Sequence, residues 1–107
     1  MADLRSLSLW RNDPQAAARI IKAAQTGDAD AQYAAGLIYA EGRGVEQNDA
    51  LSYFWLSLAH EQGDEDAMLL RNVVAVQISQ GDYDCAVVLL ARYKSGQFDL
   101  SATMNPQ

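Results

Sequence analysis

Apolar residues recur at spacings of three and four along most of this chain, which is the period of amphipathic α-helices. The clearest stripe follows residue 48 and consists of Ala50, Leu51, Phe54, Trp55, Leu58 and Ala59. Four further segments carry the same period. Their expected inward residues are Ala17, Ile20, Ile21 and Ala24; Ala31, Ala34, Ala35 and Ile38; Ala67, Leu70, Val73, Val74 and Ile78; and Tyr83, Ala86, Val87, Leu90 and Tyr93. The pattern predicts an all-α fold of about five helices.

Capping residues and glycines mark where these helices begin and end. Side chains that accept hydrogen bonds from free amides stand at each expected start: Asp13 before Pro14, Asp28, Asn48 or Asp49, Asp64 and Ser79. Gly27, Gly63 and Gly96 supply the left-handed residue that ends a helix. The segment Glu41-Gly42-Arg43-Gly44-Val45 predicts a tight reversal. Gly36 lies inside an expected helix, where it costs about 1 kcal/mol relative to alanine, so we expect close packing against it.

One short motif occurs twice. Gly27-Asp28-x-Asp30-Ala31 returns as Gly63-Asp64-x-Asp66-Ala67, which is a period of 36 residues. A fixed period of this size is typical of stacked helical hairpins. We predict a single domain over residues 1–107, with an N-terminal segment at 1–12, a helical repeat core at 13–96 and a tail without helical period at 97–107.

The stretch from Gly27 to Ala67 combines small, glycine and aromatic residues at fixed spacings, Ala31-x3-Ala35-Gly36-x2-Tyr39-x2-Gly42-x-Gly44-Val45-x2-Asn48-x-Ala50-x4-Trp55-x3-Ala59-His60-x2-Gly63-x3-Ala67. This pattern resembles the Sel-1-like repeat, a helical hairpin related to the tetratricopeptide repeat. It departs from the family at Ala35, Asn48 and His60, where leucine, aspartate and alanine are usual. The resemblance implies a short α-solenoid of antiparallel hairpins with a concave groove, adaptor or scaffold roles, and no chemistry of its own.

The net charge of the chain limits the classes of partner that it is expected to bind. The net charge is −6 with a pI near 4.4, and the eight Lys and Arg residues are scattered. Without a basic stripe to neutralise phosphates, we predict no nucleic-acid binding and no attraction to anionic membranes. The N-terminus carries Asp3 and no long apolar run, so we expect neither a secretory signal nor a membrane span, and we expect a cytoplasmic protein of bacterial type.

Residues that carry chemistry are few. His60 and Cys85 are the only histidine and cysteine, which leaves no set of soft ligands for zinc and no partner for a disulfide. We expect His60 to pack near a helix end and Cys85 to be a buried, inert thiol. We predict no catalytic residues, no metal, no cofactor and no enzymatic activity.

The remaining candidates lie on the surface. Aromatic side chains dominate binding hot spots, and Tyr53 stands off the apolar stripe of its helix. We predict partner contacts at Tyr33, Arg43, Tyr53 and Trp10. The leading hypothesis is a small adaptor or regulator that binds a protein or peptide through the repeat groove. The alternative is an immunity-type inhibitor that blocks a toxin or signalling enzyme, whose basic surface an acidic chain would suit.

Two uses of residues 1–11 stay open. This segment, with Leu4, Leu7 and Trp10, either caps the array or contacts a partner or a second copy. Contact with a second copy would give a homodimer. We expect one because about one complete repeat is present and arrays usually need three or more.

Overall fold

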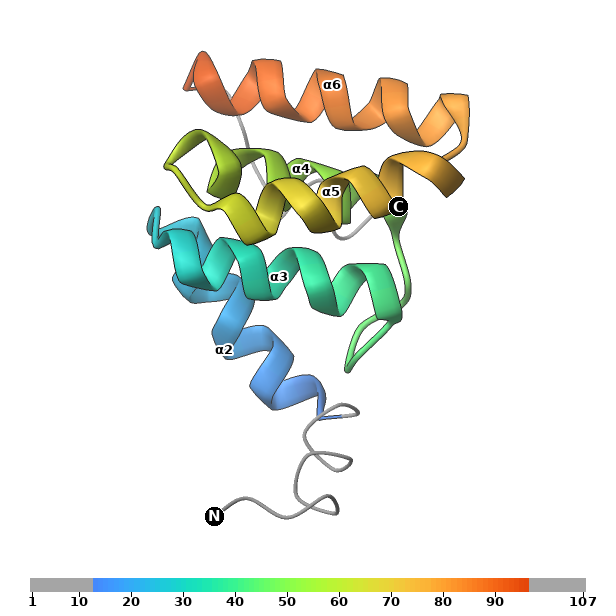
Figure 1. Cartoon of the computed structure of the whole chain (residues 1–107). Helices are drawn as coiled ribbons and strands as arrows, with labels where there is room; N and C mark the ends of the chain where they lie inside the picture. Colours follow the sequence, from blue (N-terminus) through green and yellow to red (C-terminus); the bar gives the residue numbers. More distant parts are fainter. Residues whose placement is uncertain (1–12, 97–107) are drawn as a thin grey trace.

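The computed structural model describes residues 13–96, and every regular element in this range is an α-helix (Figure 1). Consecutive helices from α3 onward run antiparallel, and α3, α5 and α6 each pack against α4, so the predicted all-α, repeat-like fold is confirmed. The predictions for residues 1–12 and 97–107, including Trp10, lie outside the described residues. The helices are α2 (Pro14–Gln25), α3 (Ala29–Glu41), α4 (Asp49–Glu61), α5 (Glu65–Gln77) and α6 (Gln80–Lys94).

The repeated motif forms two corners of the same geometry. Gly27 has φ +99° and Gly63 has φ +100°, a left-handed conformation that side chains rarely adopt. The following aspartates then cap the next helix. Asp28 accepts a hydrogen bond from the amide of Ala31 at 3.1 Å, and Asp64 accepts one from Ala67 at 3.0 Å. The period read from the sequence therefore has a structural counterpart.

The other predicted helix starts are also confirmed. Asp13 accepts from two amides of the first turn of α2, with Pro14 at the first helical position. Of the two alternatives before α4, Asn48 is the cap, since its side chain accepts from the amide of Leu51 at 3.0 Å. The hydroxyl of Ser79 accepts from the amide of Asp82 at 3.1 Å and begins α6.

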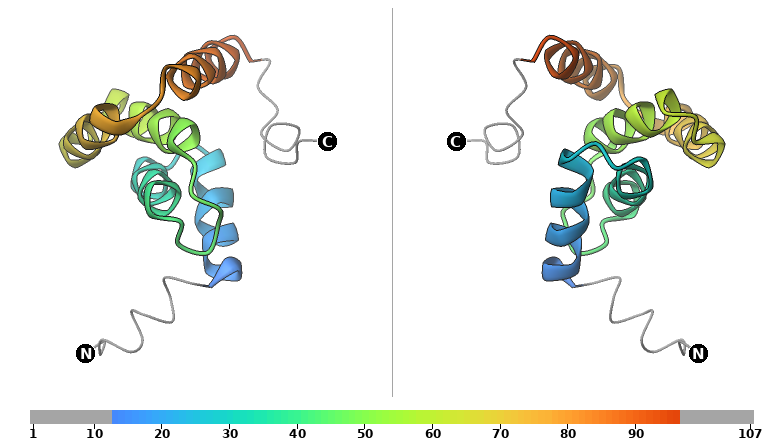
Figure 2. Two further views of the ribbon diagram at one scale, coloured as in Figure 1. Left: turned by 90° about the vertical axis from the view of Figure 1, so that its right-hand side faces the viewer. Right: turned by 90° about the vertical axis from the view of Figure 1, so that its left-hand side faces the viewer.

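Helix α4 lies at the centre of the molecule and divides its core in two. One face, with Phe54 and Trp55, packs against α2, α3 and Leu89 of α6. The other face, with Leu56 and Ala59, packs against α5. Helices α5 and α6 both pack on α4 and contact one another little. Figure 2 shows α5 and α6 on opposite sides of α4, with α2 and α3 beneath it.

Gly36 allows α3 and α4 to approach closely, as predicted. A Cβ atom added at Gly36 would lie 2.4 Å from Cγ of Leu56, a distance that real contacts do not reach. The hydroxyl of Ser52, also on α4, donates a hydrogen bond to the carbonyl oxygen of Gly36 at 2.8 Å. The absent side chain thus makes room for both an apolar contact and a buried hydrogen bond.

The predicted burial is wrong at the C-terminal end of the array. Val73, Tyr83 and Val87 were expected to face inward and are 61%, 40% and 44% exposed. Cys85, expected to be buried, is also exposed. Among the described residues no further hairpin covers α5 and α6, and each packs on α4 along a narrow stripe only. On α6 this stripe includes Leu89, which the sequence pattern did not single out.

No helix in the described part of the chain is long and apolar enough to cross a membrane.

Candidate functional site

Two hollows open on the described surface, one beside α2 and one where the ends of α4 and α6 meet the turn after α2. The α2 hollow, of about 400 Å³, is lined by Pro14, Ala18, Ile21, Lys22, Gln25 and Val45. The Tyr93 hollow, of about 340 Å³, is lined by Gly27, Gln32, Leu58, Glu61, Gln62 and Tyr93.

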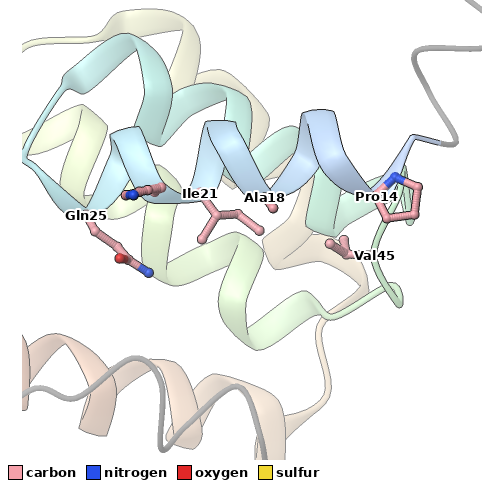
Figure 3. A pocket seen from close by; sticks show the side chains of 6 residues that line it. Pro14, Ala18, Ile21, Gln25 and Val45 are labelled. Atoms are coloured by element: carbon pink, nitrogen blue, oxygen red, sulfur yellow. The ribbon is translucent and has the colours of Figure 1, made fainter.

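The α2 hollow lies between α2 and the loop that precedes α4 (Figure 3). Close contact between this loop and the start of α2 gives the hollow its shape. Gly44 has φ +77°, and a Cβ added there would lie 2.7 Å from the carbonyl oxygen of Asp13. Only glycine allows this approach, which brings Val45 to the Pro14 end of the hollow. The walls are mostly apolar, and Lys22 is the one charged residue among those that line it.

The Tyr93 hollow has a polar wall made of two glutamine side chains. Gln32 is 1% exposed, and its amide nitrogen donates to the carbonyl oxygen of Ala24 at 3.3 Å. The amide nitrogen of Gln62 donates to the carbonyl oxygen of Gly27 at 2.9 Å and to the side-chain oxygen of Gln32 at 2.8 Å. These bonds join the ends of α2 and α4 to the first turn of α3. They hold the Gln32 side chain in place, because its amide is buried and a buried amide without partners is costly.

An aromatic and apolar wall stands beside the glutamines. Tyr93 of α6 packs edge-on against Phe54, with ring centroids 5.9 Å apart, and Leu58 of α4 is buried. Glu61 adds a carboxylate, which pairs with Lys94 at 2.8 Å. Both members of this ion pair are about half exposed, so water screens their attraction.

The residues predicted from the sequence lie elsewhere. Tyr53 sits between α5 and α6, with its ring 5.5 Å from that of Tyr83 and the Arg71 guanidinium 5.7 Å from its centroid. Tyr33 is half-buried against the α4–α5 core cluster. Arg43 pairs with Glu41 in the loop after α3, and its Nε atom is buried without a hydrogen-bond partner. None of these three lines either hollow.

Sequence reasoning missed the residues that line the hollows, with the exception of inward positions such as Ile21, Leu58 and Tyr93. One signal was present in the sequence. Gln32 stands between Ala31 and Ala35 on a helix that is otherwise apolar, and a polar residue there indicates a buried hydrogen-bonded amide. Nothing comparable marked Lys22, Gln25 or Glu61, whose exposed positions look like any solvated helix surface.

His60 lies in the last turn of α4, as expected, and its Nδ1 atom is buried without a hydrogen-bond partner. Within residues 13–96, no group of three or more His, Cys, Asp or Glu side chains is arranged to hold a metal ion.

No protein-family model, curated protein or solved structure matches this chain.

Proposed function

We propose that this chain is a non-enzymatic protein-binding module of the Sel-1-like repeat type. Its ligand is an extended segment of another protein, bound along the surface that holds the two hollows. The observation that carries the proposal is the pair of hollows on this part of the surface, which Gln25 and Gly27, two residues apart, bring close together.

The size and openness of the hollows favour side chains of a partner over a free small molecule. Small-molecule sites have volumes of about 300–1,000 Å³ and bury most of their ligand. The two hollows here lie at the lower end of that range, and both are open to solvent. A bound segment gains affinity by placing one side chain in each of them, because the two contacts then share one cost of association.

The repeat type is supported by the packing of the helices. Two corners of equal geometry lie 36 residues apart, and the glycine inside α3 fits against Leu56 of α4. Gly36 and Gly63 belong to the pattern that resembles Sel-1-like repeats. In such arrays, the stacked hairpins present an extended surface to partners.

The net charge of −6 favours a partner with a basic surface. Complementary charge accelerates association most at low salt. The preference for a basic partner applies equally to an adaptor and to an inhibitor, so it does not distinguish the two functions.

The proposal is tested by filling the α2 hollow. Peptides that bind the wild-type chain are selected from a random library, and their affinities are measured by calorimetry. Ala18 is exposed on α2, so Ala18→Trp fills the hollow without disturbing the core, and we expect affinity to fall about tenfold or more.

The matched control is Ala75→Trp, which adds the same side chain at an exposed position of α5. This control should bind the peptides as the wild type does, and both variants should keep the wild-type circular dichroism. Equal affinity for Ala18→Trp and the wild type would contradict the proposed site.

A further inference from the structure

We infer that the Tyr93 hollow accepts the guanidinium group of an arginine side chain from the protein partner. This inference rests on the proposed function and names the chemistry of one contact within it. Four features of the described residues support it: an electrostatic preference for cations, a carboxylate within the hollow, an acceptor oxygen on a second lining residue, and an aromatic wall.

The ends of three helices meet around this hollow. Helix α2 ends at Gln25, α4 at Glu61 and α6 at Lys94, and all three ends lie on the same side of the molecule (Figure 1). A helix C-terminus carries a partial negative charge on its unpaired carbonyl groups, so each of these ends favours a cation nearby.

The positive ends of α3 and α5 lie on the same side of the molecule, but acidic residues offset them. Asp28 and Asp64 accept hydrogen bonds from the first amides of these helices. Glu65 and Asp66 add further negative charge to the first turn of α5. Lys22 in the last turn of α2 and Arg92 and Lys94 in the last turn of α6 add positive charge, but the acidic residues at this end outnumber them. The potential at this end of the molecule therefore stays favourable to cations.

The acceptors for a guanidinium come from Glu61 and Gln62. The nitrogen of the Gln62 amide has two hydrogens, and the carbonyl oxygens of Gly27 and the Gln32 side chain engage both. Because those two groups can only accept, the amide has to present its nitrogen to them. Its oxygen is then left as an acceptor on a residue that lines the same hollow as Glu61.

Lys94 shows that Glu61 already attracts a cation. Its ammonium lies 2.8 Å from the carboxylate, but the pair is exposed and an exposed pair contributes little to stability. A guanidinium can replace this ammonium and form two parallel hydrogen bonds with the carboxylate, which the ammonium cannot. Lys94 thus acts as a weak internal competitor for the site.

The aromatic wall selects arginine over lysine. Tyr93 and Leu58 present aromatic and apolar surface to the hollow. A planar, weakly hydrated guanidinium stacks on such a surface, whereas an ammonium is compact and strongly hydrated. We therefore expect arginine to bind more tightly than lysine.

The test is a titration of the ¹⁵N-labelled chain with N-acetyl-arginine methylamide, followed by amide chemical shifts. We expect saturable shifts at Gly27, Gln62 and Tyr93. The matching lysine and citrulline compounds should bind more weakly, because lysine lacks the planar group and citrulline lacks the charge. Equal binding of all three compounds, or shifts that do not saturate, would overturn the inference.

Two substitutions should act in opposite directions. Glu61→Gln removes the carboxylate and should weaken arginine binding about tenfold, the effect of losing a charged hydrogen-bond partner. Lys94→Ala removes the competitor and should tighten binding by about two- to fivefold. Glu46→Gln makes the same charge change at an exposed loop position and should leave binding unchanged.

Failure of this inference differs from failure of the proposed function. If library peptides bind the wild type and lose affinity with Ala18→Trp, but Glu61→Gln matches Glu46→Gln toward the arginine compound, the groove stands and the arginine site is wrong. If the arginine compound binds as expected but Ala18→Trp leaves peptide affinity intact, the arginine site stands and the extended groove is wrong.

Discussion

Gly36 determines how closely α3 and α4 pack, and its replacement tests that contact. Gly36→Ala gains about 1 kcal/mol of helix propensity, but its new Cβ would lie 2.4 Å and 2.5 Å from two carbon atoms of Leu56. Leu56 is fully buried, so the overpacking should cost about 1–3 kcal/mol and outweigh the gain. We expect a net loss of unfolding free energy, measured by urea denaturation.

Gly81 provides the matched control, because a Cβ added there meets nothing within 4 Å. Gly81→Ala should be neutral or stabilise the chain by up to about 1 kcal/mol. In the Gly36→Ala background, Leu56→Ala should cost less than in the wild type, since it removes the atoms that clash. A Gly36→Ala variant as stable as the wild type would show that α3 and α4 are not in close contact.

Ionisation of Tyr39 should lower the stability of the folded chain at alkaline pH. Burial raises the pKa of Tyr39 from 10.0 to about 12. Because the folded pKa lies above the unfolded one, the stabilisation is complete below pH 10 and is lost as the pH rises toward 12, at up to about 3 kcal/mol. Tyr39→Phe cannot ionise, so its unfolding free energy should fall less than that of the wild type between pH 10 and 12. Parallel pH profiles of the two proteins would refute this role.

At the scale of the element, the two repeated corners should contribute equally. Asp28 and Asp64 cap their helices through the same hydrogen bond, so Asp28→Ala and Asp64→Ala should each cost about 0.5–2 kcal/mol of unfolding free energy. Asp30 lies in the first turn of α3 without a capping bond, and Asp30→Ala should cost only a few tenths of a kcal/mol. The unfolding free energy of each variant is measured by denaturation. If Asp28→Ala and Asp64→Ala lower it by different amounts, the repeated motif does not stabilise the two corners equally.

These corners could be predicted from sequence because their causes are local. A cap needs one side chain and one amide three residues away, and a left-handed turn needs one glycine. Burial on α5 and α6 was harder, because periodicity shows which face of a helix is apolar but not whether a neighbour covers it. Val73 and Val87 fit the apolar period and are nonetheless exposed.

At the scale of the whole molecule, the hollows could not be predicted because they depend on where separate helices end. The Tyr93 hollow brings together residues 27, 32, 58, 61, 62 and 93, from the three helices α3, α4 and α6 and the turns that follow α2 and α4. Gln62 and Gly27 are 35 residues apart and meet only because the hairpins stack. Local sequence patterns do not show which residues from distant parts of the chain come into contact.

The central position of α4 predicts how the molecule opens. Among the helices of residues 13–96, α6 packs extensively only on α4, so it can separate while the other described helices stay packed. Leu89 of α6 is buried against the core, and Leu89→Ala should lower the unfolding free energy by about 2–5 kcal/mol. We expect native-state hydrogen exchange to show this loss in the amides of α6, with little change in α3 and α4.

Phe54 on α4 is the contrasting site, because it contacts Tyr93 and belongs to the core cluster that joins α2, α3 and α6. Phe54→Leu should lower the protection of all described helices together, by about 1–2 kcal/mol. Uniform loss of protection in Leu89→Ala would instead show that α6 unfolds only with the rest of the chain. Separate opening of α6 matters for function because it would move Tyr93 out of the hollow that it lines. The stability of α6 would then affect the affinity for the partner.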